Sequence, residues 1–233
     1  MQYVDINTFD GKNMRGLYVP AQTDDPRNAP GIVLIQEIFG INDAMQEFSR
    51  IWSANGFNVL CPDLFFRQEP NLTLDPNTPA EFEKGVQLMQ SMNLEHTLND
   101  LESTRAHLAT TIGHENIGAI GYCLGGRLVI QMGAQGLIKA AVSYYGVNLE
   151  KVLPQVPTTA APGYLHIAAL DKYVEEPKCT QIVENVTKRK GWEYAIYENC
   201  DHAFARPNGV HYVAEAAQQA EQRSAEFLRK HLK

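Results

Sequence analysis

The stretch GAIGYCLGGRL, residues 118–128, decides the fold class, because it places Cys123 among glycines where a strand pattern gives way to a helix pattern. Residues 116–122, NIGAIGY, are typical of a buried strand, and residues 124–136, LGGRLVIQMGAQG, are typical of a helix. The spacing G-x-C-x-G matches the strand-turn-helix pattern of a nucleophile on a sharp turn, with sulfur in place of oxygen.

The same alternation of strands and helices runs through the rest of the chain. Short apolar runs predict strands at 29–40, 57–64, 139–146, 162–170 and 192–198. Amphipathic runs predict helices at 43–56, 80–92, 95–113, 176–191 and 211–232. In the first of these helices, Asp43 is expected to cap the start and Gly56 to end it. This order predicts an α/β fold with a mostly parallel central sheet and helices on both faces.

Length and charge narrow the class of protein. We expect the 233 residues, 1–233, to form one domain, because no repeat or linker divides them. The net charge is −7 and no run of lysine and arginine occurs, so nucleic acid is not expected as a partner. No apolar run is long enough to span a membrane and no targeting segment is recognisable, which predicts a cytoplasmic protein.

The cysteines are widely spaced. Cys61, Cys123, Cys179 and Cys200 form no CxxC pair, so neither a zinc knuckle nor a thioredoxin-type site is expected. Free thiols in a reducing compartment are the simplest interpretation.

Cys123 has two interpretations from its surroundings. As a nucleophile, it would be assisted by the helix that begins after it, whose first amides and positive end favour a thiolate, with the Leu124 amide as first oxyanion donor. As a packing residue, it would be a small buried side chain between glycines that ease strand and helix contact. The local pattern leaves both open.

A base and its orienting acid are expected after the nucleophile in chain order. Asp171 ends the apolar run at 162–170, and His202 follows the run at 192–198, so both lie where the carboxyl ends of parallel strands place a site. Asp171 could instead cap the next helix, and His202 could be a surface histidine. The order and spacing together favour catalysis.

The segments QEIFG (36–40), CPDL (61–64), GYCLGG (121–126) and DHAFAR (201–206) occur in register, and over nearly its full length the chain resembles the dienelactone hydrolase family. The resemblance implies the α/β-hydrolase fold and a Cys-His-Asp triad. It also implies an activity, the opening of an enol-lactone (4-carboxymethylenebut-2-en-4-olide) in the degradation of aromatic compounds, with no cofactor and no metal.

The resemblance assigns roles to these positions. Cys123 would attack the lactone carbonyl, His202 would be the acid/base partner, and Asp171 would hold the His202 ring. The amide of Ile38 would join that of Leu124 as the oxyanion hole.

Two further charged residues receive roles in the same way. Glu37 would pair with Arg206 at rest and take the thiol proton of Cys123 when substrate binds. Arg206 would bind the substrate carboxylate through a two-pronged contact. Glu37 could otherwise have only the structural role of pairing with an arginine.

The sequence departs from the family in the substrate region. A second carboxylate-binding arginine is expected there, but no arginine occurs between Arg67 and Arg105. Lys84 or Arg67 could take its place. Tyr145 could line the pocket or, with Tyr144, pack in the core.

The leading hypothesis is a hydrolase of a small anionic lactone. Hydrolysis of another ester or thioester, or binding of carboxylates by Arg206 without catalysis, are the alternatives. Two weaker hypotheses are a redox-sensing thiol pair and a metal site of Cys200, His202 and His211. The spacings between these three residues match no common metal site. We expect a monomer whose partner is the small-molecule substrate.

Overall fold

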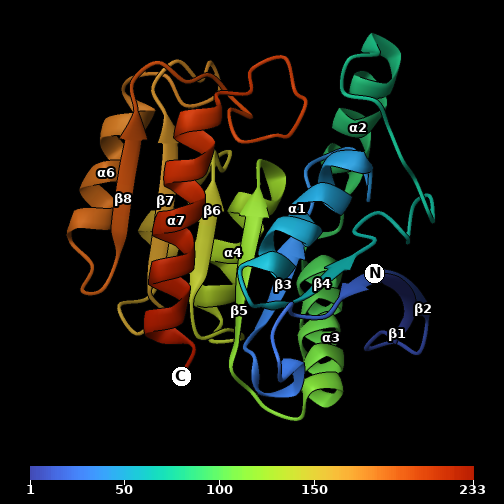
Figure 1. Cartoon of the computed structure of the whole chain (residues 1–233). Coiled ribbons are helices and arrows are strands. Elements are labelled where there is room, and N and C mark those ends of the chain that lie inside the picture. Colours follow the sequence, from blue (N-terminus) through green and yellow to red (C-terminus); the bar gives the residue numbers. More distant parts are fainter. The chain divides into compact units, whose positions relative to one another are not determined.

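Strands and helices alternate along the chain in a computed structural model that describes all 233 residues, which confirms the predicted α/β class. The chain divides into two units, Met1–Ile117 and Gly118–Lys233. Figure 1 shows the elements of each. The prediction of one domain over 1–233 stays a prediction.

The first unit contains a four-stranded sheet in the order β1-β2-β4-β3. The β1/β2 and β2/β4 pairs are antiparallel and the β3/β4 pair is parallel. Helices α1 and α3 pack against these strands. The elements are β1 (Gln2–Asn7), β2 (Asn13–Val19), η1 (Pro26–Asn28), β3 (Gly31–Ile35), α1 (Asp43–Ala54), β4 (Asn58–Pro62), α2 (Pro79–Ser91) and α3 (Leu94–Ile112).

The second unit contains the parallel strands β5-β6-β7-β8. Helix α7 lies across one face of these strands, and α4 and α6 lie behind them (Figure 1). The elements are β5 (Ile117–Tyr122, whose first residue ends the first unit), α4 (Leu124–Ala134), β6 (Ala141–Tyr144), α5 (Leu149–Val152), η2 (Leu153–Gln155), β7 (Gly163–Ala168), α6 (Lys178–Thr187), β8 (Glu193–Tyr197) and α7 (Ala214–His231).

Helix ends differ from the predictions in three places. Asn42 caps α1, since its side chain accepts a hydrogen bond from Met45 N at 3.2 Å, so the predicted cap Asp43 is wrong. Gly56 does follow the helix, with a φ of 87°. Helix α6 begins at Lys178, after Pro177, and α7 begins at Ala214, because the preceding residues have extended or turn backbone.

A buried polar cluster joins β7, β8 and α7 in the second unit. His166 Nδ1 lies 2.9 Å from Tyr197 Oη, and His166 Nε2 lies 2.8 Å from Ser224 Oγ. Ser224 Oγ also lies 2.8 Å from Tyr144 Oη. Burial, reinforced by the charge of Arg223, lowers the pKa of His166 to about 3. The histidine is therefore neutral in the folded protein, where it links two strands to a helix.

This cluster predicts acid-sensitive stability. The folded pKa of about 3 lies below the ordinary value of 6.5, so below pH 6.5 the unfolded chain binds a proton that the folded chain does not. The free energy of unfolding should fall as pH drops from 6.5 towards 3, by up to about 1.4 kcal/mol per pH unit. Urea unfolding of native protein and His166→Gln between pH 7 and 4.5 measures this: the variant should be less stable at pH 7 and less sensitive to acid.

Exposed His96 provides the control. His96→Gln should leave the acid slope of the native protein unchanged. Parallel pH curves for native protein and His166→Gln would contradict the assignment.

Candidate active site

Cys123 lies at a strained turn between β5 and α4. Its φ is 55° and its ψ is −111°, in the positive-φ region that side chains rarely adopt. Cys123 N donates to Tyr144 O at 3.0 Å, and Cys123 O accepts from Val147 N at 3.3 Å. These backbone bonds to β6 and its following loop hold the half-buried cysteine in place.

The glycines around Cys123 are required by close backbone contacts. A Cβ atom at Gly121 would lie 2.0 Å from Gly125 O, and one at Gly126 would lie 2.7 Å from both Gly146 Cα and Ser143 Oγ. Real Cβ atoms do not approach so closely, so neither position tolerates a side chain without backbone movement. At Gly121, the first glycine of G-x-C-x-G, the requirement for glycine is therefore steric.

The two amides assigned to the oxyanion hole lie in different units. Leu124 is the first residue of α4, where helix amides have no partner within the helix. Ile38 follows β3 in the first unit, and α2 packs tightly against it: a Cβ atom at Gly85 would lie 2.6 Å from Ile38 O. The oxyanion role of both amides stays a prediction.

Asp171 and His202 are brought together in the second unit. Asp171 Oδ2 lies 2.7 Å from His202 Nδ1, and Asp171 Oδ1 accepts a hydrogen bond from Tyr173 N at 2.8 Å. The Asp171 side chain is fully buried and the His202 side chain is 12% exposed. Both oxygens of the carboxylate are therefore occupied, and the His202 ring is held through one nitrogen.

Backbone bonds connect the two loops that bear this pair. Ala169 N donates to Tyr197 O at 3.1 Å, and Leu170 N donates to Cys200 O at 2.9 Å. They continue the parallel β7/β8 pairing beyond the strand ends, where Ala168 pairs with Tyr197.

Two tyrosine rings pack edge-on against the His202 ring. The ring centroid of Tyr145 lies 5.1 Å from that of His202, and the centroid of Tyr173 lies 4.9 Å from it. Tyr145 is buried and has a φ of 39°. Its predicted substrate contact stays a prediction. The sequence interpretation missed Tyr173, whose only signal is its position two residues after Asp171.

The electrostatics of His202 couple it to Cys123. Burial lowers the pKa of His202, but the charge of Cys123 and hydrogen bonds to Asp171 and Cys123 outweigh burial and raise it well above its ordinary value. The raised pKa of His202 thus depends on contacts with both the sulfur of Cys123 and the carboxylate of Asp171. This is the arrangement that a cysteine nucleophile with a histidine partner requires.

Glu37 and Arg206 are both buried charged residues. Glu37 is 1% exposed in the segment after β3, and Arg206 is 9% exposed, four residues after His202 in the same loop. Burial of ionised side chains is costly without compensating partners, so these residues are not ordinary surface charges. Their assigned pairing and their roles towards substrate stay predictions.

The candidates for the second carboxylate-binding cation already have acidic partners. Arg67 donates from Nε to Asp100 at 2.6 Å and from Nη1 to Asp10 at 2.8 Å. Lys84 Nζ lies 2.7 Å from Glu69 on the surface, and its predicted substrate contact stays a prediction.

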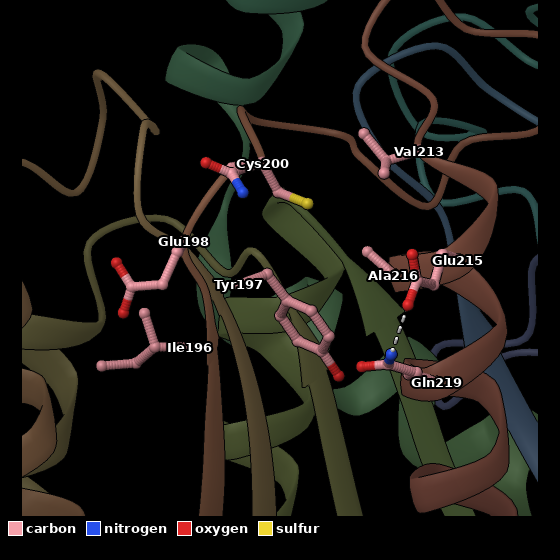
Figure 2. Close-up of a pocket in the computed structure, with 9 residues that line it drawn as sticks. Ile196, Tyr197, Glu198, Cys200, Val213, Glu215, Ala216 and Gln219 are labelled. Atoms are coloured by element: carbon pink, nitrogen blue, oxygen red, sulfur yellow. Dashed lines mark hydrogen bonds between the residues drawn. The ribbon is translucent and has the colours of Figure 1, made fainter.

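A pocket of about 230 Å³ lies beside the His202 loop, between the end of β8 and the start of α7. In Figure 2, Tyr197, Cys200 and Gln219 surround this space, and Ile196 and Glu198 point to the other side of β8. Cys123 is not among its lining residues, which are Ile196, Tyr197, Glu198, Asn199, Cys200, Val213, Glu215, Ala216 and Gln219. This pocket is separate from the proposed nucleophile.

The remaining sequence hypotheses concern thiols, metals and membranes. All four cysteines are free, and Cys200 is buried. No group of three or more histidine, cysteine, aspartate or glutamate side chains is arranged to hold a metal ion. None of the helices combines the length and the apolar character needed to cross a membrane.

The fold and these residues together define an α/β-hydrolase. Parallel strands alternate with helices, a strained turn follows β5, and a paired histidine and aspartate follow the later strands. Residues 17–232 match the model of the dienelactone hydrolase family. The chain belongs to the dienelactone hydrolase family.

Individual relatives agree with this family. The carboxymethylenebutenolidase of Pseudomonas putida is 36% identical over 97% of this chain and 94% of its own. Carboxymethylenebutenolidase 1 of Cupriavidus pinatubonensis is 34% identical over 97% of this chain and 95% of its own. A solved structure from Klebsiella pneumoniae subsp. pneumoniae MGH 78578 has a TM-score of 0.81, at 22% identity over 98% of both chains. The predicted fold class is confirmed.

Proposed function

We propose that this protein is a cofactor-free carboxylic ester hydrolase that opens 4-carboxymethylenebut-2-en-4-olide through an acyl thioester on Cys123. The observation that carries the proposal is the 2.7 Å contact between Asp171 and His202, whose ring is coupled electrostatically to Cys123. The substrate class is supported by family membership and by the names of the relatives. Degradation of aromatic compounds is the proposed setting.

The first half of the proposed reaction acylates Cys123. Arg206 binds the substrate carboxylate, and Glu37 takes the thiol proton of Cys123. The sulfur attacks the lactone carbonyl, a C–S bond forms, and the amides of Leu124 and Ile38 donate to the resulting oxyanion. Collapse of the tetrahedral intermediate breaks the ring C–O bond, and the departing enolate oxygen takes the proton back from Glu37.

The second half hydrolyses the thioester. His202 removes a proton from water while the water oxygen attacks the thioester carbonyl, and the C–S bond then breaks to release the acid. The thiolate of Cys123 recovers a proton from His202, and the new carboxylic acid ionises in solvent. Asp171 stabilises the imidazolium form of His202 throughout this half.

The acyl thioester can be trapped directly. Native protein mixed with the lactone and quenched in acid within milliseconds should show one added substrate mass on the peptide that contains Cys123, together with loss of the lactone absorbance. Exposure alone would allow modification of Cys179, which is also half-buried. The adduct should persist in Cys179→Ala and disappear in Cys123→Ala. Turnover without an adduct on Cys123, or an adduct on Cys179, would contradict the proposal.

A further inference from the structure

Tyr173 is the more exposed of the two tyrosines whose rings contact His202. Its ring centroid lies 4.9 Å from that of His202, at an interplanar angle of 78°. Tyr145, the other tyrosine, is 1% exposed, whereas Tyr173 is 37% exposed. The His202 side chain is 12% exposed and that of Asp171 is fully buried. Of the two rings, that of Tyr173 therefore covers the Asp171–His202 pair towards solvent.

The main chain holds Tyr173 at this place. Tyr173 N donates to Asp171 Oδ1 at 2.8 Å, and Tyr173 O accepts a hydrogen bond from Lys178 Nζ at 3.1 Å. Tyr173 thus contacts both members of the pair, the carboxylate through its amide and the imidazole through its ring. Neither hydrogen bond involves the phenol ring, so a change of side chain removes only the contact with His202.

A single hydrogen bond to Asp171 leaves the His202 ring free to tilt. The bond is made through Nδ1, and the χ2 torsion of histidine has a broad energy minimum. The tilt matters because the other ring nitrogen transfers the proton, and a misplacement of about 1 Å can cost about 10²-fold in rate. Aromatic pairs prefer defined edge-to-face geometries. The ring contacts of Tyr145 and Tyr173 therefore restrict the tilt.

We propose that Tyr173 is a positioning residue for the base: its ring fixes the orientation of the His202 imidazole and keeps water from the hydrogen bond between His202 and Asp171. Exclusion of water strengthens such a bond, because the local dielectric constant falls. The inference rests on the proposed function, since it takes His202 as the acid/base partner of Cys123. It adds a residue that acts on the reaction only through His202.

The hydrogen-bonded proton of His202 tests the inference without substrate. In protein with isotope-labelled histidine, NMR at pH 7 would measure the exchange of the His202 Nδ1 proton with water. The resonance is identified by its absence in His202→Gln. Tyr173→Ala should exchange this proton roughly tenfold faster or more, because water reaches the bond. Tyr173→Phe keeps the ring and should exchange at the native rate.

Steady-state kinetics on the lactone provides the second readout. Tyr173→Ala should lower kcat about tenfold with little change in KM, and Tyr173→Phe should restore kcat. Tyr194→Ala is the matched control, because Tyr194 lies in β8 of the same unit and is also 37% exposed. This variant should change neither the exchange rate nor kcat.

The outcomes distinguish the inference from the proposed function. Native exchange in Tyr173→Ala would overturn the role of Tyr173. A raised KM with unchanged kcat would also overturn it, because Tyr173 would then be a substrate contact. Equal losses in Tyr173→Phe and Tyr173→Ala would assign the effect to the hydroxyl group and contradict the role of the ring. Faster exchange in Tyr173→Ala, without lactone hydrolysis by the native protein, would support the positioning role and overturn only the proposed substrate.

Discussion

Asp171→Asn is expected to hydrolyse the lactone about 10³- to 10⁴-fold more slowly than the native protein, with little change in KM. Asp171 Oδ2 lies 2.7 Å from His202 Nδ1, and its charge contributes to the raised pKa of His202. An asparagine has nearly the same shape, but it has no charge and can present an NH₂ group to the ring. The imidazolium form of His202 is then less stable. The neutral ring can also adopt the other tautomer, in which the nitrogen that faces the substrate carries the proton.

The neighbouring carboxylate is the matched control for this prediction. Asp201 Oδ1 accepts a hydrogen bond from His202 N at 2.6 Å, and an asparagine oxygen can accept the same bond. Steady-state kinetics should therefore show Asp201→Asn within a few-fold of the native kcat. Equal losses in the two variants would mean that loop geometry, and not the Asp171 charge, supports catalysis.

Gly121→Ala is expected to lower the free energy of unfolding by at least about 3 kcal/mol and to abolish activity. The added Cβ, whose position is fixed by the backbone, would lie 2.0 Å from the main-chain atom Gly125 O, so no side-chain rotation relieves the contact. Either β5 or the first turn of α4 must move, and Cys123 lies between them. Urea unfolding and lactone hydrolysis measure the two effects.

Gly133 lies in α4, and we expect substitution there by alanine to be tolerated. A Cβ atom there would lie 3.6 Å from the Cβ atoms of Ala141 and Ala161, which is ordinary contact. Gly133→Ala should keep full activity and gain up to about 1 kcal/mol of stability, because alanine favours helix over glycine. Similar destabilisation by both substitutions would show that helix packing, and not the turn at Cys123, limits Gly121.

Local steric rules made the turn at Cys123 and the order of the site residues predictable from the sequence. Glycines at a strand-to-helix junction have a steric meaning that does not depend on distant residues. Asp171 and His202 could be located because polar residues after consecutive parallel strands meet at one edge of the sheet. The Asp171–His202 contact follows from that rule.

Contacts between distant residues could not be predicted in the same way. Arg67 meets Asp10 and Asp100, which lie 57 and 33 residues away, so no periodic pattern relates them. Arg127 stands within the stretch that decides the fold, but helical spacing does not reveal that its Nε is buried without a partner. The sequence also did not decide which of two adjacent residues, Asn42 or Asp43, caps α1, because both residue types can cap a helix.

The backbone bonds between the Asp171 and His202 loops have a consequence for sequence variation. Every residue except proline supplies the same N–H and C=O groups, so the bonds from Ala169 N and Leu170 N do not depend on the side chains there. Substitutions at exposed positions such as Leu170 should therefore be tolerated without loss of the Asp171–His202 distance. Proline at position 169 or 170 is the exception, since it would remove a donor and separate the base from its carboxylate.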